Sequence, residues 1–414
     1  MSFNFQQNRL FAESKSLSEI ANEFGTPCYV YSRAAFESQL AQYHQGLEGH
    51  DGLICYAVKA CSNIAILNIL AKKGAGFDIV SIGELQRVIT AGGDPKKVVF
   101  SGVAKEYHEI QYALEVGIHC FNVESPDEID LINQVASDLN TIAPISLRVN
   151  PDVDAKTHPY ISTGLKDNKF GVDIKSAASV YERAATLKNI KIKGVDCHIG
   201  SQLTDVTPFM DALDRVLALV DELSAKGIEI EHLDLGGGIG VDYQGETPPN
   251  IPAYIQSVRK KIEGRNLSLI FEPGRSISAN SGVLLTKVQF LKPNDHKNFA
   301  IIDAGMNDLI RPSLYSAWQN IQLIEPSNAP VKTWDLVGPI CETGDFLGKE
   351  RKLALEQNSV VAVMGSGAYG FTMASNYNTR NKPCEVLVDG DTVHLIGKRQ
   401  TFEQQIENEQ LIQE

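Results

Sequence analysis

The chain is predicted to be an α/β protein, with a closed (β/α)8 barrel of the TIM type followed by an antiparallel β domain. Two patterns predict this architecture. From residue 52 to 275, short β-branched runs alternate with longer amphipathic segments, and after residue 282 strand-like runs follow one another with turn-length gaps. A length of 414 residues is also too long for one compact core and indicates two or more domains.

Eight strand-like runs give the first region its rhythm. Strands that alternate with helical segments pair in parallel, and eight such units in roughly 220 residues match a closed barrel. Helical segments between them include 62–73, 125–139 and 207–227. An open doubly wound sheet is the alternative that this pattern leaves. The runs cover residues 52–60, 75–81, 97–102, 119–125, 144–151, 192–201, 230–238 and 268–275.

The second region contains strands but few helical segments. The pair Asp389-Gly390 separates two alternating runs, which indicates a hairpin. The run 26–32 belongs either to this β domain or to the start of the barrel. We predict a barrel domain over 34–277 and a β domain over 278–414, completed by 1–33, with the boundary open between 275 and 285. Its strands are expected at 282–291, 297–305, 320–325, 333–338, 359–365 and 384–398.

Bulk composition excludes several classes of protein. The net charge of −13 argues against nucleic acid or an anionic membrane as partner. No run of 18 apolar residues indicates a membrane span, and the N-terminus lacks the pattern of a signal peptide. Seven cysteines without C-x-x-C spacing disfavour a disulfide framework and a zinc site. We therefore expect a cytoplasmic protein with reduced thiols and no metal.

Chemically capable residues follow the predicted barrel strands. The active site of such a barrel forms at the carboxyl ends of its strands, and a random distribution would place these residues at both ends. Their common position predicts an enzyme site. They are Lys59, Asp78, Ser81, Arg148, Asn150, His198, Ser201, Gly236 to Gly238, Glu272 and Arg275.

Two glycine-rich stretches are candidates for a phosphate-binding or dinucleotide-binding site. "LDLGGGIG" (233–240) follows the seventh strand, where barrels often bind phosphate through backbone N–H groups, although a tight turn is the plain alternative. "GSGAYG" (365–370) satisfies the dinucleotide fingerprint, but the following "FTMASNYNTRNKP" is a poor helix. Since that fingerprint requires strand, turn and helix, we reject a dinucleotide site there.

Lys59 is the residue whose role matters most. A lysine at a strand end commonly extends its amine into water. Opposite a phosphate loop, it indicates instead a Schiff base with pyridoxal 5′-phosphate, whose ring nitrogen Glu272 would keep protonated. His198 is either a satisfied polar residue or a ring stacked on this cofactor.

Six motifs together resemble the fold-type III pyridoxal-phosphate decarboxylases, over nearly the whole chain. The resemblance implies a barrel plus a β domain, and a homodimer with active sites shared between subunits. It further implies conversion of meso-2,6-diaminopimelate to L-lysine and CO2, the last step of lysine biosynthesis. The motifs are "YAVKA" (56–60), "HIGSQ" (198–202), "GGGIG" (236–240), "EPGR" (272–275), "MNDLIRPSLY" (306–315) and "CETGD" (341–345).

The resemblance also implies roles for individual residues. Lys59 would form the Schiff base, His198 would stack on the ring, and Cys341 would donate a proton from the other subunit. Cofactor contacts are implied for Lys59, Asp78, His198, Ser201, Gly237, Gly238, Glu272, Gly274, Arg275 and Tyr369. Substrate contacts are implied for Arg275, Arg311, Tyr315, Glu342 and Tyr369.

Two departures from the family pattern, Cys61 and Thr343, remove neither a charge nor a nucleophile. For the substrate, arginine offers a planar fork to a carboxylate, and glutamate pairs with an ammonium. A substrate with no distal carboxylate would leave buried arginines unpaired, at a cost of several kcal/mol. Decarboxylation of ornithine, arginine or lysine stays the alternative, and a pyridoxal-phosphate carrier protein is a weaker one.

Overall fold

The computed structural model of the protein describes residues 2–153 and 169–412. The chain divides into two compact units. The barrel unit comprises residues 37–242 and 246–277, and the β unit comprises residues 1–36, 243–245 and 278–414. No helix in the described part of the chain combines the length and apolar composition that crossing a membrane requires.

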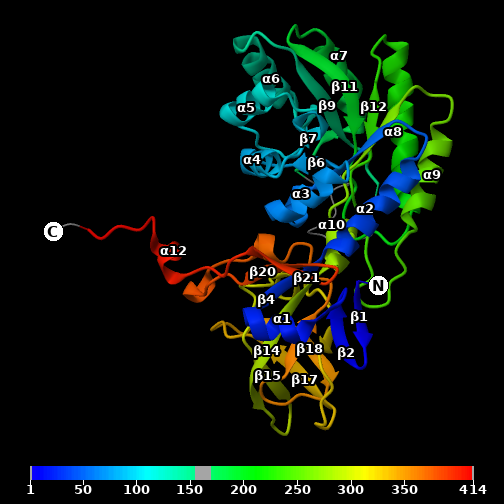
Figure 1. The fold of residues 1–414 in the computed structure, drawn as a ribbon. Coiled ribbons are helices and arrows are strands. Elements are labelled where there is room, and N and C mark those ends of the chain that lie inside the picture. Colours follow the sequence, from blue (N-terminus) through cyan, green and yellow to red (C-terminus); the bar gives the residue numbers. More distant parts are fainter. Residues whose placement is uncertain (1, 154–168, 413–414) are drawn as a thin grey trace. The chain divides into compact units, whose positions relative to one another are not determined.

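Eight parallel strands form the closed barrel, as the sequence predicts (Figure 1). Each of the eight runs overlaps one strand, and pairing of the fourth strand with the fifth closes the sheet, which excludes the open doubly wound alternative. A short strand, β10 (Val172–Asp173), pairs outside β9. The barrel strands are β5 (Gly52–Ala57), β6 (Gly76–Ile79), β7 (Val98–Phe100), β8 (Cys120–Val123), β9 (Ala143–Asn150), β11 (Ile190–Asp196), β12 (His232–Asp234) and β13 (Ser268–Phe271).

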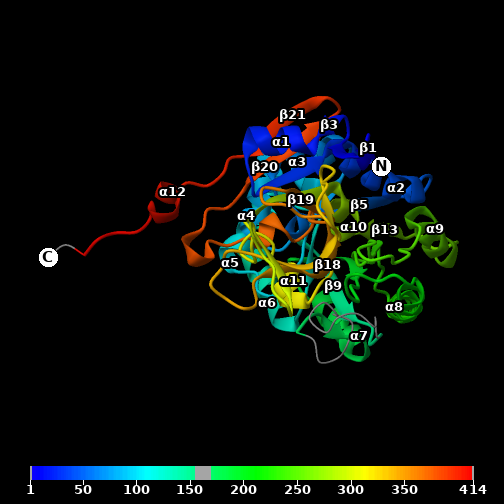
Figure 2. The same ribbon diagram turned by 90° about the horizontal axis from the view of Figure 1, so that it is seen from below.

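Helices follow the strands and lie outside them (Figure 2). Polar side chains start most of these helices directly after a strand: the Ser81 side chain accepts from the Glu84 N–H, and the Ser125 side chain accepts from the Glu128 N–H. Such caps satisfy N–H groups that a helix leaves open. The helices are α2 (Arg33–Leu47), α3 (Ile64–Lys72), α4 (Ile82–Thr90), α5 (Tyr107–Val116), α6 (Pro126–Asp138), α7 (Ile174–Ala185), α8 (Thr207–Ala225), α9 (Ile251–Lys261) and α10 (Arg275–Ser278).

The barrel strands are apolar because both of their faces are covered. Every residue of β6, β7 and β8 is buried. Phe77, Phe100 and Phe121 expose no surface at all. This two-sided burial explains why the strands read as continuous apolar runs and not as alternating ones.

Lys59 lies in a short turn and not within the first strand. Strand β5 ends at Ala57, and Val58–Ala60 forms a 3₁₀ turn. The Lys59 side chain is 41% exposed. The lysine is thus only partly buried, because the strand ends two residues earlier, although its amine still reaches the buried carboxylate of Asp78.

The β unit contains a nine-stranded sheet and a smaller three-stranded one. The larger sheet has the order β18-β17-β15-β14-β4-β20-β21, with β19 pairing β14 and β16. Its strands are β4 (Cys28–Ser32), β14 (Gly282–Lys292), β15 (Asn298–Ile302), β16 (Ile321–Leu323), β17 (Lys332–Val337), β18 (Phe346–Leu353), β19 (Val360–Val363), β20 (Cys384–Asp389) and β21 (Thr392–Gly397). The smaller sheet contains β1 (Phe3–Gln6), β2 (Arg9–Ala12) and β3 (Lys15–Ser16), and the helices are α1 (Leu17–Phe24), α11 (Arg311–Tyr315) and α12 (Phe402–Ile406).

This sheet differs from the purely antiparallel prediction in two pairs. Strands β15 and β17 are parallel, and so are β4 and β20. Strand β4 lies within the run 26–32, which thus belongs to the β unit. Strand β18 had no counterpart in the prediction, because its charged centre, Lys349 to Lys352, is typical of an edge strand that is kept polar.

Candidate active site

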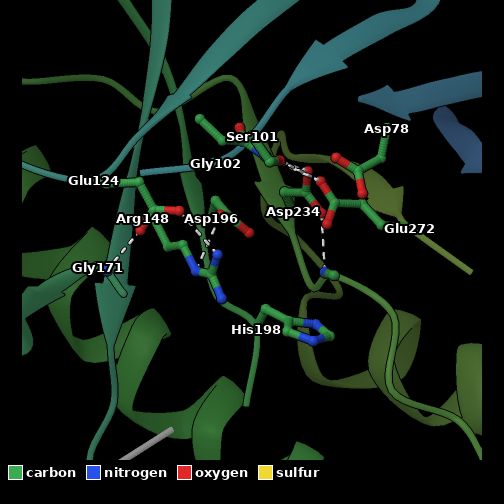
Figure 3. A network of polar contacts seen from close by, with 12 residues as sticks. Asp78, Ser101, Gly102, Glu124, Arg148, Gly171, Asp196, His198, Asp234 and Glu272 are labelled. Carbon is green, nitrogen blue, oxygen red and sulfur yellow. Dashed lines mark hydrogen bonds and ion pairs between the residues drawn. The ribbon is translucent and has the colours of Figure 1, made fainter. Parts of the chain in front are cut away.

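The carboxyl end of the barrel gathers polar side chains from most of its strands (Figure 3). Several of them are buried acids: Asp78, Asp196, Asp234 and Glu272. One oxygen from each of Asp196, Asp234 and Glu272 lies within 4.8 Å of the others. The barrel therefore concentrates negative charge at one point inside its wall.

Lys59 forms an ion pair with the acid on the next strand. Its Nζ donates to Oδ2 of Asp78, whose side chain is fully buried. The other oxygen, Oδ1 of Asp78, is buried without a hydrogen-bond partner. Burial raises the pKa of nearby Glu84 to about 7, although the Val80 N–H and the Lys59 charge oppose this. The ion pair with Asp78 thus holds the Lys59 amine at the carboxyl end of the barrel.

Glu272 lies in a network of buried donors and acids. Asn122 Nδ2 lies 3.0 Å from Glu272 Oε1 and 3.2 Å from Asp234 Oδ2, and Ser101 Oγ donates to Glu272 at 3.4 Å. Burial raises the pKa of Glu272 well above its usual range, and the charges of Asp234 and Asp78 raise it further. Burial also raises the pKa of Asp234, to about 6. Burial and the mutual repulsion of the two carboxylates therefore both favour a proton on this pair.

His198 is fixed as a neutral ring. Its Nδ1 accepts from the Gly237 N–H at 3.2 Å, so the ring proton lies on Nε2. Burial lowers the pKa of His198 well below its usual value, and the charges of Arg148 and Lys59 lower it further. The neutral His198 ring thus adds no charge to the site, and it is suited to stacking on another planar ring.

Arg148 balances part of the acidic charge. Its Nη1 donates to Glu124 Oε1 at 2.9 Å, and its Nε lies 3.9 Å from Asp196 Oδ2. Burial raises the pKa of Asp196, which Asp234 raises further and Arg148 lowers. A second contact of Glu124, from the Gly171 N–H at 2.6 Å, holds this ion pair in place.

The glycine loop after β12 has room only for backbone. A Cβ on Gly237 would lie 2.3 Å from the Glu272 carbonyl oxygen, and a Cβ on Gly236, whose φ is +63°, would lie 2.6 Å from His198 Nδ1. Beside the loop, Arg275 Nε and Nη2 lie 3.2 Å and 3.1 Å from Ser201 Oγ. A guanidinium, a hydroxyl and a bare backbone form a donor set suited to phosphate.

These barrel residues fit pyridoxal phosphate. The cofactor needs an amine for its aldehyde, an acid for its ring nitrogen and donors for its phosphate. Lys59, Glu272 and the loop with Ser201 and Arg275 provide these groups within one unit. Gly274 contributes backbone: its carbonyl accepts from the Ile277 N–H and starts α10.

A cavity of about 810 Å³ lies at the opposite, amino-terminal end of the barrel strands, and His119, Glu231 and Ser268 are among its lining residues. Its charged groups are largely paired with one another, as Lys193 is with Glu231 and Arg265 is with Asp221. Residues at this end of a barrel contribute mainly to stability. We therefore place the chemistry at the carboxyl end.

In the β unit, the "CETGD" segment is organised by its last residue. Asp345 is 3% exposed and accepts from the Met306 and Ile340 N–H groups, each at 2.7 Å. These bonds present Cys341 and Glu342 at the surface, where Tyr377 is hydrogen-bonded to Glu342. Cys341 is the one exposed thiol among the seven cysteines, all of which are described.

Arg311 begins helix α11, and its side chain is buried. The residue is 6% exposed, and its guanidinium carbon lies 4.5 Å from the centroid of the Tyr243 ring. Tyr315 ends the same helix and is partly exposed. Tyr369 lies in the 365–370 loop with a φ of +54°. A 3₁₀ turn, Phe371–Met373, follows that loop in place of the helix that a dinucleotide site requires.

Sequence reasoning missed the residues that support the acids. Asn122 and Asp234 lie within strands β8 and β12, and neither was among the residues predicted for the strand ends. An asparagine inside the otherwise apolar run "CFNV" was a usable signal. Cys61 is buried, and its carbonyl accepts from the Tyr56 hydroxyl at 3.2 Å, which gives the residue a structural role.

Comparisons with known proteins identify the family of the chain. Residues 33–279 match the family model described as the pyridoxal-binding domain of pyridoxal-dependent decarboxylases. Diaminopimelate decarboxylase of Pseudomonas aeruginosa is 58% identical over 410 residues, which cover 99% of both chains. The enzyme of the same name from Vibrio cholerae is 58% identical over 400 residues, 96% of each chain. The crystal structure of Helicobacter pylori diaminopimelate decarboxylase complexed with L-lysine matches with a TM-score of 0.92 and 43% identity, covering 95% of this chain and 99% of the other.

Proposed function

The chain belongs to the pyridoxal-dependent decarboxylases, and within them to the diaminopimelate decarboxylases, and we propose that it converts meso-2,6-diaminopimelate to L-lysine and CO2. This reaction is the last step of lysine biosynthesis. The observation that carries the proposal is the arrangement of Lys59, Glu272 and the glycine loop within a chain that is 58% identical to such an enzyme.

Bound pyridoxal phosphate supplies an electron sink for the pair left behind by departing CO2. Lys59 would hold its aldehyde, after giving up the proton that now binds it to Asp78. Glu272 would hold a proton at the ring nitrogen, and the Asn122 amide would keep that carboxyl group oriented. His198 would cover one face of the ring as a neutral imidazole.

Substrate recognition requires residues that bind the distal carboxylate and ammonium groups of diaminopimelate. We propose that Arg311, with Arg275 and Tyr315, binds the distal carboxylate, and that Glu342 binds the distal ammonium. Burial of Arg311 favours this role, because a buried guanidinium gains most from a carboxylate partner. Tyr369 is proposed to contact cofactor and substrate.

The proton that replaces CO2 is proposed to come from a cysteine of a second copy of the chain, the partner's Cys341. The exposure of Cys341 supports this, because a buried thiol could not reach another subunit. A homodimer, which light scattering would detect at a mass of two chains, is part of this proposal. So are a cytoplasmic location and a division into domains 34–277 and 278–414 with 1–33.

The test is CO2 release from meso-diaminopimelate, lysine, ornithine and arginine, each with added pyridoxal phosphate. Diaminopimelate should be the preferred substrate by kcat/KM. Preference for ornithine, arginine or lysine would establish the alternative substrate class, and cofactor binding without any CO2 release would establish a carrier.

A further inference from the structure

We infer that Tyr243 is a positioning residue, which holds the Arg311 guanidinium where it binds the substrate's distal carboxylate. This inference rests on the proposed function of Arg311. Tyr243 lies outside all the motifs on which the sequence analysis relied. It acts through Arg311 and makes no proposed contact with cofactor or substrate.

The first observation is the stacked contact itself. The Arg311 guanidinium carbon lies 4.5 Å from the Tyr243 ring centroid, well within the range of a cation–π interaction. Arg311 is 6% exposed, so little water competes with the ring. Because an aromatic face attracts a cation without neutralising it, the guanidinium retains its attraction for a substrate carboxylate.

The second observation is that the three-residue segment containing Tyr243 belongs to the β unit and not to the barrel unit. Tyr243–Gly245 packs with the β unit, although the residues on both sides of it belong to the barrel unit. Within this segment, the Tyr243 ring is the group that lies against the Arg311 guanidinium.

The third observation is that the ring is itself held in place. A Cβ on Gly365 would lie 3.0 Å and 3.2 Å from Cε1 and Cδ1 of Tyr243, and Gly365 has a φ of +64°. A glycine is therefore required for the ring to sit against this loop. This explains the first glycine of "GSGAYG", the motif that resembled a dinucleotide fingerprint.

The arginine is fixed at its backbone as well. Arg311 is the first residue of α11, and Pro312 follows it at the start of that helix. With the backbone set by the helix and the guanidinium set by Tyr243, few rotamers remain open. A long side chain that is ordered before binding loses less entropy when the carboxylate arrives.

The test measures KM and kcat for diaminopimelate in the full chain saturated with pyridoxal phosphate. Y243A should raise KM by about two- to thirty-fold, the range of cation–π interactions, with kcat within two-fold. Y243F keeps the ring and should match the wild type. Y243L keeps the bulk of the side chain without an aromatic face, and its KM should resemble that of Y243A. If Y243A folds poorly, the comparison of Y243F with Y243L still tests the inference.

A double-mutant cycle separates this inference from the proposed function. If Tyr243 acts through Arg311, Y243A adds no further increase of KM in an R311A background. Two results would overturn the role of Tyr243 without affecting the proposed function. One is an additive effect of the two substitutions on KM, and the other is a wild-type KM in both Y243A and Y243L while R311A raises KM. A wild-type KM in R311A, or no diaminopimelate turnover by the wild type, overturns the proposed function instead. Y107A, at the exposed first residue of α5, controls for loss of a tyrosine.

Discussion

Asn122 is the residue through which the buried acids of the barrel can be perturbed most cleanly. Its amide nitrogen approaches Glu272 and Asp234, and its side chain is fully buried. Replacement by leucine keeps the number and branching of the side-chain heavy atoms but removes both N–H donors. With about 1.5 kcal/mol for each hydrogen bond to an acidic partner, N122L should destabilise the barrel unit by roughly 3 kcal/mol.

The destabilisation should also depend on pH. Asp234 has a folded pKa of about 6, against an unfolded value near 3.8, so wild-type stability falls as pH rises through this interval. The Asn122 hydrogen bond lowers that pKa. Without it the pKa is higher, and the loss of stability continues above pH 6. The effect of N122L should therefore grow between pH 5 and pH 8, by about 1.4 kcal/mol for each unit of additional shift.

The assay must report on the barrel unit alone. Both tryptophans, Trp318 and Trp334, lie in the β unit, so fluorescence provides an internal reference that should not change. Hydrogen exchange of peptides from β8, β12 and β13, followed by mass spectrometry, gives the opening free energy of the barrel. In the matched control N133L, one hydrogen bond to the Asn189 N–H is lost, and the cost should be about 1 kcal/mol at every pH. Equal effects of N122L at pH 5 and pH 8 would refute the proposed charge coupling.

Three further predictions concern the proposed chemistry. E272Q should reduce kcat by at least about a hundredfold while pyridoxal phosphate still binds, as absorbance spectra would show; near-normal kcat contradicts its role at the ring nitrogen. In the native chain one thiol should react rapidly with a thiol reagent, and C341S should abolish that reaction, because the other six cysteines are buried. C341A should keep cofactor binding and lose lysine formation. D345A should lower kcat by about tenfold or more through disorder of residues 341–345, and D345N should restore part of it; equal activity of D345A and wild type would show that the loop holds without Asp345.

The barrel was predictable because its strands are buried on both faces and therefore appear as apolar, β-branched runs. Its polar strand ends were predictable for the same reason, since Lys59 and Glu272 interrupt that pattern where the strands end. The β sheet was harder to predict, because turn-length gaps suggest hairpins, whereas β4 and β20 pair in parallel across most of the chain. The stacking of Tyr243 on Arg311 had no local sequence signal at all, because the two residues are brought together only by tertiary packing.

The balance of charge in the barrel explains why these acids tolerate one another. Asp196, Asp234 and Glu272 converge within 4.8 Å, which would be strongly unfavourable if all three were ionised. Arg148 offsets one of these charges, and burial raises the pKa of Asp234 and of Glu272, which favours a proton on the pair. What remains is a site that favours a further positive charge near Glu272. A protonated ring nitrogen on the cofactor would supply such a charge. Burial of these acids is costly in the folded chain, but it would also favour the protonated ring of the proposed cofactor, which is the form that accepts electrons.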